Sequence, residues 1–250
     1  MDKRTPAVLA GIALMSAGAT NTALVIGLGT GYTSGFLLSL NVGHVTTVEI
    51  NPAISGASKQ FVGDLLSSSP QWSLVLDDAR SRILTSKETY DVITSEPSWP
   101  LSASVAPLFT REFMRAAKSR LKPGGAFSQW LPDYMLGPED VMMMYKTARQ
   151  VFPRVDVWTV NDPDGTPGEL VLVGFNEPGA PSQAEIGKRI SAAMKASGYD
   201  NAFSAHADPA GLERAVDDPS IPLNTDDHAL LEYRVVWNFL ASHNAKMPER

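Results

Sequence analysis

The length, composition and charge of the chain exclude several classes of protein. Its 250 residues, of which 44% are hydrophobic and 19% charged, are typical of a globular protein with a sizeable core. Twenty-seven acidic residues against 21 basic ones give a net charge of −6, which argues against a nucleic-acid-binding protein. The sequence has no cysteine, which excludes disulfides and thiol nucleophiles, and its four scattered histidines lack metal-ligand spacing, so we expect no metal.

The first apolar segment, residues 7–18, is too short to span a bilayer. Because Lys3 and Arg4 precede it, one interpretation is the apolar part of a signal sequence. The other, which we favour, is a buried helix ahead of the first strand. We expect no membrane segment in this chain and a cytoplasmic location, either alone or as the soluble part of a larger or membrane-fused protein.

Strands and helices alternate through the middle of the chain. Apolar and β-branched runs predict strands at residues 23–27, 44–50, 72–78, 90–96 and 126–131. Helical patterns occur at residues 33–41, 52–66, 79–84, 108–121 and 138–152. The runs at 155–160 and 169–175 flank a turn-rich segment and predict an antiparallel hairpin at a sheet edge. We therefore expect an α/β fold, with a doubly wound, mostly parallel, Rossmann-like seven-stranded sheet and an antiparallel edge hairpin.

The alternation of strands and helices ends near residues 178–181, where we place a boundary within one compact unit. The sequence of residues 182–250 predicts helices and loops. We assign residues 1–180 to a catalytic domain that holds the nucleoside site described below. We assign residues 181–250 to a helical C-terminal extension packed on that domain.

A glycine-rich turn, "GLGTG", follows the first predicted strand and precedes a helix. Its Gly27, Gly29 and Gly31 permit positive φ and close approach of a ligand, and the helix start offers free N–H groups. Alone the pattern is weak, because glycine turns between a strand and a helix are often purely structural.

Acidic residues lie at the ends of the next two strands. Glu49 can accept hydrogen bonds from both ribose hydroxyls of a nucleoside. Asp78, within "DDA", can accept one from an adenine amino group. The alternative is that Glu49 and Asp78 are exposed acids that cap helices. Because the three elements converge on one edge of the sheet, they favour a nucleoside site.

The glycine spacing, G-x-G-x-G, differs from the G-x-G-x-x-G of dinucleotide sites, and no Gly-Lys-Ser/Thr follows it. It favours a nucleoside without phosphates, namely S-adenosylmethionine or its decarboxylated form as a co-substrate. The predicted donor-binding residues are Gly27, Gly29, Thr30, Gly31, Glu49, Ile50, Asp78 and Ala79.

Several segments occur in the same order as in the spermidine synthase-like proteins. The chain resembles the polyamine aminopropyltransferase family over residues 20–175, with a shorter match at 223–234. As a set the segments are specific, although each alone is common among class I methyltransferases. They read "ALVIGLGTGYTSG", "VTTVEINPAI", "LDDARSRIL", "YDVITSEPSWP", "LFTREFMRAAKSRLKPGGAFSQWL" and "LNTDDHALLEYR".

The resemblance implies that an amine attacks the aminopropyl carbon of decarboxylated S-adenosylmethionine and that methylthioadenosine leaves. An ammonium must lose a proton before it can attack, so a carboxylate is needed as base. The family carries Asp-Ser-Ser-Asp-Pro at the end of the fourth strand, where its first Asp is base and amine anchor. Glu96 takes the place of that first Asp, which makes Glu96 the candidate catalytic residue.

This chain departs from the family at the same strand end. Ser98 occupies a serine position, and Trp99 replaces the second Asp, so a cation-binding carboxylate is lost while an aromatic face is gained. The family's amino-terminal β domain also has no counterpart here, which argues against putrescine and for another small amine. The alternative is that Pro97 and Pro100 merely end a strand, with Trp99 packed on the sheet.

Residues of the fifth strand and of the C-terminal part complete the predicted site. We expect Gln129 and Trp130 to line the acceptor pocket together with Ser98 and Trp99, or else to pack at the edge of the sheet. Asp226 and Asp227 are expected to cap the following helix rather than to touch substrate.

Three functions remain open at this level. The first is aminopropyl transfer to a small amine, without a nucleic-acid partner and with a homodimer as the assembly to test. The second is an S-adenosylmethionine-dependent methyltransferase. The third is a nucleoside-binding domain that has lost catalysis.

Overall fold

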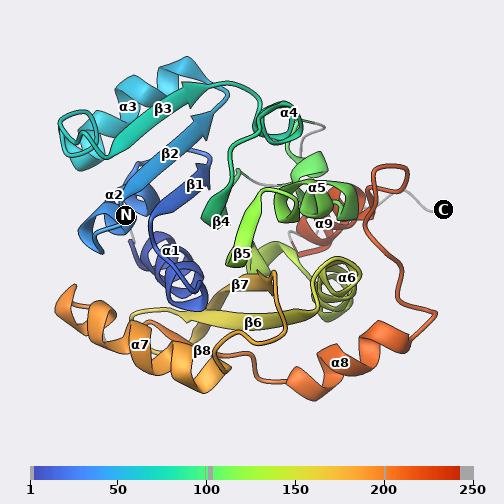
Figure 1. Ribbon diagram of the computed structural model, residues 1–250. Coiled ribbons are helices and arrows are strands. Elements are labelled where there is room, and N and C mark those ends of the chain that lie inside the picture. The colour runs from blue at the N-terminus through green and yellow to red at the C-terminus, as the bar shows by residue number, and fades with distance from the viewer. Residues whose placement is uncertain (1–2, 99, 101–103, 200, 243–250) are drawn as a thin grey trace.

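The computed structural model describes residues 3–98, 100, 104–199 and 201–242, which form an eight-stranded sheet between two layers of helices (Figure 1). The strand order is β3-β2-β1-β4-β5-β7-β6-β8. The first five strands in that order are parallel, and the last three continue the sheet in antiparallel pairs. The strands are β1 Thr22–Ile26, β2 His44–Glu49, β3 Trp72–Leu76, β4 Tyr90–Ser95, β5 Leu121–Leu131, β6 Arg154–Asn161, β7 Pro167–Phe175 and β8 Phe203–Ala205.

The helices follow the predicted alternation. They are α1 Arg4–Ser16, α2 Tyr32–Ser39, α3 Pro52–Val62, α4 Ala79–Thr85, α5 Arg111–Lys118, α6 Pro138–Arg149, α7 Gln183–Ala196, α8 Pro209–Asp217 and α9 Leu230–Ser242, with the short 3-10 helices η1 Ala106–Phe109 and η2 Asp133–Met135. The predicted α/β fold with a mostly parallel sheet and an antiparallel edge is therefore confirmed.

The predicted number of strands, seven, is one too few. An eighth strand, β8, pairs with β6, so the β6–β7 hairpin is not the outer edge. Within the hairpin, β7 lies next to β5. Three residues are too few to show an alternating pattern, which is why the sequence predicted only helices and loops after residue 182.

The helix predicted at residues 108–121 is shorter in the structure. The Thr110 side chain accepts the Phe113 N–H and caps α5, so Phe109 belongs to the preceding η1. Downstream, Leu121 already begins β5, whose register against β4 shifts between Tyr90 and Val92. The Pro-Gly-Gly segment is thus a strand irregularity rather than the end of a helix.

One face of the sheet is covered by α1, α2 and α7. Residues 7–14 of α1 are all buried, which confirms the interpretation as a helix packed ahead of the first strand. A Cβ added to Gly11 would lie 2.7 Å from the side chain of Ile190, so glycine lets α7 pack closely on α1. None of the helices in the described part of the chain is both long and apolar enough to cross a membrane.

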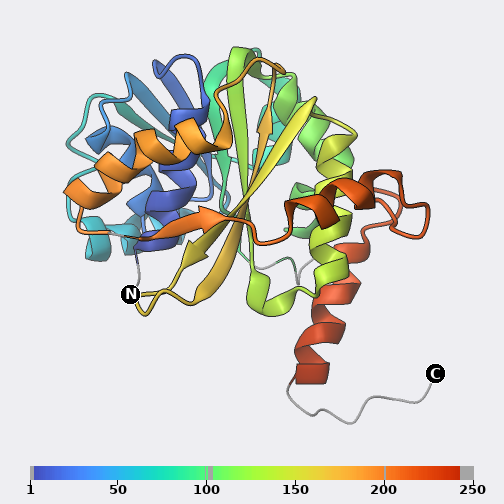
Figure 2. The ribbon, with the colours of Figure 1, turned by 90° about the horizontal axis from the view of Figure 1, so that it is seen from below.

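The opposite face is covered by α4, α5 and α6, against which the C-terminal helices pack. Leu212 of α8 and Leu231 and Val235 of α9 are buried in the same hydrophobic cluster as Phe127 of β5. Figure 2 shows the far end of α9 projecting from the body of the molecule. The division into residues 1–180 and 181–250 stays a prediction.

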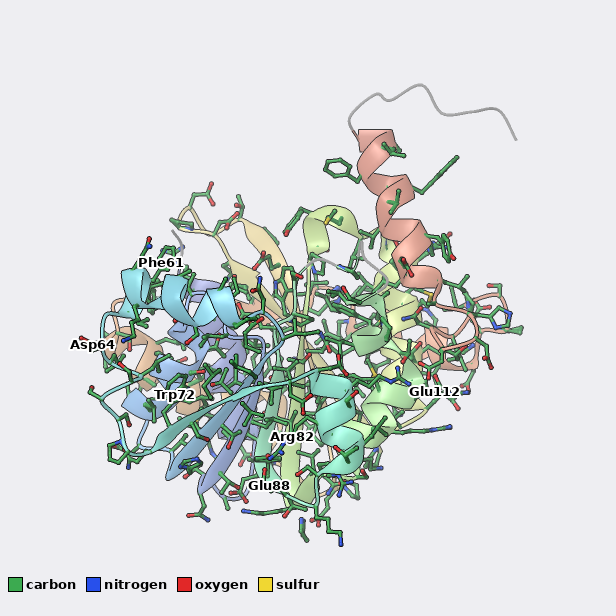
Figure 3. All side chains as sticks on the ribbon, turned by 90° about the horizontal axis from the view of Figure 1, so that it is seen from above. Phe61, Asp64, Trp72, Arg82, Glu88 and Glu112 are labelled. Carbon is green, nitrogen blue, oxygen red and sulfur yellow. The ribbon has the colours of Figure 1, made fainter. Side chains whose placement is uncertain are left out.

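Side chains hold the loop that leads into β4, at the amino ends of the parallel strands. Arg82 of α4 pairs with Glu88 at 2.8 Å, and Glu88 also accepts the Tyr90 hydroxyl at 2.8 Å (Figure 3). The Arg82–Glu88 pair is partly exposed and contributes little free energy alone. Together with the Tyr90 bond it orients the start of β4, the strand that Glu96 follows.

Candidate active site

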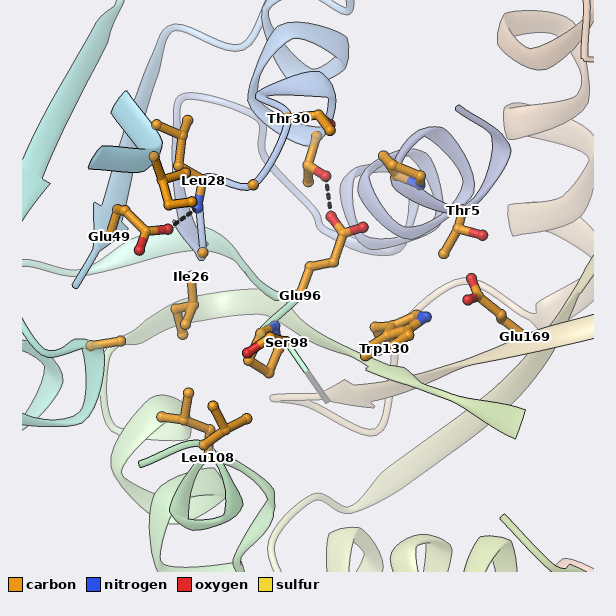
Figure 4. A pocket seen from close by; sticks show the side chains of 18 of the residues that line it. Thr5, Ile26, Leu28, Thr30, Glu49, Glu96, Ser98, Leu108, Trp130 and Glu169 are labelled. Atoms are coloured by element: carbon orange, nitrogen blue, oxygen red, sulfur yellow. Dashed lines mark hydrogen bonds between the residues drawn. The ribbon is translucent and has the colours of Figure 1, made fainter. Parts of the chain in front are cut away.

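A cleft of about 1210 Å³ opens at the carboxyl ends of the parallel strands. Ile26 ends β1, Glu49 ends β2, Asp77 follows β3 and Glu96 follows β4, and all four line the cleft. Ligands of open α/β sheets bind at this edge, near the point where the strand order reverses. Figure 4 shows the side chains that surround this cleft.

The glycine turn forms the floor of the cleft. Gly27, Gly29 and Gly31 all have positive φ, at 88°, 50° and 84°, as the glycine pattern predicted. A Cβ on Gly27 would lie 2.7 Å from the carbonyl oxygen of Glu96, so only glycine allows β1 and β4 to end this close together. Gly27, Gly29 and Thr30 line the cleft.

Glu49 presents a carboxylate held by two backbone donors. Its Oε2 accepts the Leu28 N–H at 2.9 Å (Figure 4), and its Oε1 accepts the Asn51 N–H at 2.8 Å. The residue is 9% exposed, and α3 is capped by Asn51 rather than by Glu49. The capping interpretation is therefore wrong for Glu49, and each of its oxygens keeps a lone pair for a further donor.

Asp78 caps a helix and also lines the cleft. Its Oδ1 accepts the Ser81 N–H at 2.7 Å and caps α4, while the residue also lines the cleft. Next to it lie Ala79 and, from the loop after β2, Ile50, whose side chain is 63% exposed. Leu108 of η1 lines the same cleft, so apolar surface suited to a planar base is available there.

Glu96 lies between the end of the cleft formed by Glu49 and the opposite end formed by Trp130 and Glu169 (Figure 4). Its N–H continues the sheet by donating to the Ile26 carbonyl at 3.0 Å, and its carboxylate accepts a hydrogen bond from the Thr33 hydroxyl. Burial raises the pKa of Glu96 to about 7; the Thr33 bond opposes this rise, and the like charge of Glu169 adds to it. A carboxyl group with this pKa can exchange protons near neutral pH.

The far end of the cleft combines an aromatic ring with further carboxylates. Trp130 of β5 is 6% exposed, lines the cleft, and has a buried indole N–H without a hydrogen-bond partner among the described residues. Glu169 of β7 and Asp133 of η2 line the cleft beside it. Burial raises the pKa of Asp133, and the nearby His206 opposes the rise. Ser98 is exposed and also lines the cleft.

Two predicted site residues do not line the cleft, and a third lies outside the described residues. Gln129 is fully buried, because neighbouring strand residues point to opposite faces and Trp130 takes the face toward the cleft. Gly31 faces the side chains of Leu66 and Val62 instead, and so shapes the turn from behind. Trp99 is the residue that the structure does not describe.

The sequence missed three residues that shape the site. Thr33 lies in the first turn of α2, directly after the glycine turn. A hydroxyl at this position could reach the end of a neighbouring strand, but the sequence alone does not show that the strand is β4. Asp133 follows the end of β5 and could have been found by the rule that located Glu49 and Asp78. Glu169 carried no such signal, because its position depends on β7 lying next to β5.

Charge is the most distinctive property of the cleft. No lysine, arginine or histidine lines it within the described part of the chain. The acids that line it are Glu49, Asp77, Asp78, Glu96, Asp133, Asp162 and Glu169. A cleft with this lining attracts cations and repels anions.

Asp226 does not cap the following helix, which corrects the prediction. α9 begins only at Leu230, whereas the Asp226 carboxylate contacts the Arg80 guanidinium and accepts the Thr110 hydroxyl at 2.7 Å. Asp227 is exposed. The segment before α9 thus reaches back to the start of α4, beside the cleft.

The fold is shared with solved structures of two kinds. A spermidine synthase in complex with the transition-state analogue AdoDATO aligns with a TM-score of 0.63 and 21% identity, over 70% of this chain and 61% of that chain. A probable spermidine synthase from Corynebacterium glutamicum gives 0.68 and 16%, over 90% and 80%. Human methyltransferase-like protein 13, in complex with SAH, gives 0.59 and 22%, over 88% and 94%. These structures define the fold class, an α/β fold common to aminopropyltransferases and methyltransferases.

The sequence identifies the family within that class. The family model described as the spermine/spermidine synthase domain matches residues 4–173, so the chain belongs to the spermine/spermidine synthase family. Polyamine aminopropyltransferase 2 from Hyperthermus butylicus is 29% identical over 179 residues, which cover 69% of this chain and 59% of the relative. The polyamine aminopropyltransferase from Shigella sonnei is 30% identical over 118 residues, which cover 46% and 41%. The chain thus spans about half the length of the curated relatives it matches.

Proposed function

We propose that the chain catalyses aminopropyl transfer from decarboxylated S-adenosylmethionine to a small amine. The observation that carries this proposal is the lining of the cleft, with seven carboxylates and no basic side chain among the described residues. Both co-substrates of the reaction are cations before transfer, and such a cleft favours both. Membership of the spermine/spermidine synthase family supports the same reaction.

The donor nucleoside would occupy the end formed by the glycine turn, Glu49 and Asp78. The two backbone N–H bonds fix the Glu49 carboxylate, which is then ready to accept both ribose hydroxyls. The adenine would lie near Ile50 and Leu108, with its amino group toward Asp78. Decarboxylated S-adenosylmethionine adds two positive charges and no carboxylate, which suits the acidic lining better than the intact form does.

Glu96 would bind the attacking amine and take its proton. The acceptor ammonium loses one proton to the Glu96 carboxylate, and the freed nitrogen lone pair attacks the aminopropyl carbon next to sulfur. A carbon–nitrogen bond forms while the carbon–sulfur bond breaks, and its electron pair stays on sulfur. The products are a secondary ammonium, neutral methylthioadenosine and protonated Glu96, which then releases its proton to solvent.

Positioning supplies most of the remaining rate, because the sulfonium is already a good leaving group. The close approach of Gly27 to the Glu96 carbonyl fixes the nucleoside end and the amine end in one rigid unit. The Thr33 hydrogen bond orients the carboxylate within that unit.

The test is a turnover assay with each donor and a panel of small amines, followed by mass spectrometry of both products. The proposal predicts methylthioadenosine and an aminopropylated amine from the decarboxylated donor, both strongly reduced in Glu96→Gln. S-adenosylhomocysteine formed from the intact donor would instead establish methyl transfer. Binding of methylthioadenosine without turnover of either donor would favour a domain that has lost catalysis.

A further inference from the structure

A second groove lies behind the glycine turn, on the outer side of α2. Its volume is about 340 Å³, within the range of sites for small molecules. Its walls come from the start of α1, from α2, from the end of α3 with the turn that follows, and from the segment after α7. None of its described lining residues also lines the acidic cleft. This outer groove is therefore separate from the candidate active site.

Aromatic rings form much of the lining of the outer groove. The rings belong to Tyr32 and Phe36 of α2, Phe61 of α3, and Tyr199. Phe61 is 45% exposed (Figure 3), and Leu65, which lines the groove with it, is 52% exposed. Rings and an exposed leucine around a groove offer a surface on which a flat apolar group can be buried.

A positive charge lies at the same groove. Lys3 is the one charged residue among the described residues that line it. The Lys3 Nζ lies 4.4 Å from the centre of the Tyr32 ring. The pKa of Lys3 is raised, first by the Tyr32 side chain and less by Tyr199, while desolvation opposes the rise. An ammonium beside two tyrosine side chains can donate hydrogen bonds to an anionic ligand.

The charge of the outer groove is opposite to that of the cleft and to the net charge of the chain, −6. Asp64, in the turn after α3, does not line the groove. Its carboxylate is already bound by the Lys59 Nζ at 3.3 Å and by the Ser67 hydroxyl at 3.2 Å. The groove is thus complementary to an anion with an apolar body, whereas the cleft is complementary to cations.

Two contacts join the wall of the outer groove to the cleft. Tyr32 lines the groove, and the next residue, Thr33, donates its hydroxyl hydrogen bond to the Glu96 carboxylate in the cleft. Val62, also in the wall, lies 3.1 Å from the position that a Cβ on Gly31 would take, so the wall packs directly on the glycine turn. A ligand that shifts either contact changes the geometry of the cleft.

We propose that the outer groove is a regulatory site for a small molecule with a flat apolar body and one negative group, such as an aromatic carboxylate. The rings of Tyr32 and Phe61 hold the apolar body, and Lys3 binds the negative group. Occupancy reaches the cleft through Thr33 and Gly31. The inference goes beyond the proposed aminopropyl transfer and does not depend on it, because neither co-substrate enters this groove.

Ligand-observed NMR titration of the wild-type protein tests the binding part. The probes are hydrocinnamate, its neutral amide, the cation phenylpropylamine, and butyrate, which has the carboxylate but no ring. Ligands of this size bind with a Kd on the order of 1 mM. We expect hydrocinnamate to bind at least about fivefold more tightly than its amide, because the ammonium–carboxylate hydrogen bond is charge-assisted. Butyrate and phenylpropylamine should both bind more weakly than hydrocinnamate.

Three variants at exposed positions separate the contributions of charge and ring, and their exposure makes unfolding unlikely to intervene. Lys3→Met should abolish the preference for hydrocinnamate over its amide. Phe61→Ser should weaken both of these probes and leave their ratio unchanged. Lys59→Met removes a positive charge from an α3 position outside the groove lining, and it should leave the preference intact.

The backbone amide signals of Gly29 and Thr30 test the regulatory part. Both residues line the cleft and neither lines the outer groove. Saturating hydrocinnamate should shift these signals in the wild-type protein. The same concentration should leave them in place in Lys3→Met.

Each result either supports or overturns the inference. Equal affinity of the wild-type protein for hydrocinnamate and its amide overturns it, as does an equal loss of preference in Lys59→Met, because the effect would then be one of general charge. Binding that leaves the Gly29 and Thr30 signals unchanged overturns the regulatory role. A preference lost only in Lys3→Met, with shifted cleft signals, supports the inference whether or not the protein transfers aminopropyl groups.

Discussion

Arg80 and Asp226, which lie 146 residues apart in the chain, form a two-point ion pair beside the cleft. The Arg80 Nη1 lies 2.9 Å from Asp226 Oδ1, and its Nη2 contacts Oδ2. Arg80 Nη1 also donates to the Pro107 carbonyl at 3.1 Å. Arg80 therefore joins the first turn of α4, where Asp78 and Ala79 line the cleft, both to η1, where Leu108 lines it, and to the segment before α9.

Removing this pair should weaken the nucleoside end of the cleft. Asp226→Asn leaves Arg80 with neutral hydrogen-bond acceptors only, among them the Pro107 carbonyl, so the start of α4 is held less firmly against the segment before α9. We expect the Kd for methylthioadenosine to rise by about threefold to tenfold, a modest effect because the pair is partly exposed. Calorimetry measures this, and the affinity of the amine should change by less than about twofold.

The control for Asp226→Asn is the exposed ion pair of Lys59 and Asp64, which are 3.3 Å apart and do not line the cleft. Asp64→Asn makes the same chemical change and should leave nucleoside affinity unchanged. An unchanged Kd in Asp226→Asn would show that the pair only joins the C-terminal segment to the fold.

The activity of the protein should follow the ionisation of Glu96. Because its pKa is raised to about 7, the carboxylate forms only as pH rises through that value. The kcat/KM should therefore rise with pH, with an inflection near 7, and this inflection should be absent in Glu96→Gln. Thr33→Val removes the hydrogen bond that lowers the pKa, so it should move the inflection to higher pH. An inflection unchanged by Thr33→Val would mean that another group titrates.

The free energy of unfolding should also depend on the ionisation of Glu96. Activity requires the ionised carboxylate, whereas folding favours the protonated form. A raised pKa means that the folded protein binds the proton more tightly, so stability is fully present below the unfolded pKa of about 4.5 and is lost as pH rises through 7. Glu96→Gln, which is always neutral, should have a Tm about 3–6 °C above that of the wild-type protein at about pH 8.5.

That difference in Tm should shrink as pH falls through 7 and disappear below about 4.5. Differential scanning calorimetry across this range checks it. A constant difference across the whole range would show that the substituted side chain packs differently rather than that a charge has been removed.

The glycine turn should tolerate no side chain at its first position. Gly27→Ala adds a methyl group 2.7 Å from the Glu96 carbonyl and forces a non-glycine residue to φ 88°, which costs about 1–2 kcal/mol before the clash is counted. We expect a lower Tm and a Kd for methylthioadenosine raised by at least about tenfold. Gly63→Ala is the matched control, since Gly63 also has positive φ, at 57°, but has open space around it and lies outside the cleft lining. Equal nucleoside affinity in both variants would contradict the role given to the turn.

Local patterns predicted the parallel half of the sheet and most of the residues that line one end of the cleft. The glycine turn, Glu49 and Asp78 lie at strand ends, and strand ends can be read from short apolar runs. The amine end could not be predicted as well, because it depends on which strands become neighbours. Trp130 and Gln129 are adjacent in sequence, and only the pleat and the cover by α1 decide which of them meets the cleft. Glu169 reaches the site only because β7 inserts between β5 and β6.

We propose that this acidic cleft holds a cationic adenosine donor without a carboxylate. Isothermal titration calorimetry of the wild-type protein with the decarboxylated and the intact forms of S-adenosylmethionine is the decisive measurement. We expect the decarboxylated form to bind at least about tenfold more tightly, because no basic side chain among the described lining residues can neutralise the methionine carboxylate. Equal affinities, or tighter binding of the intact form, would contradict it.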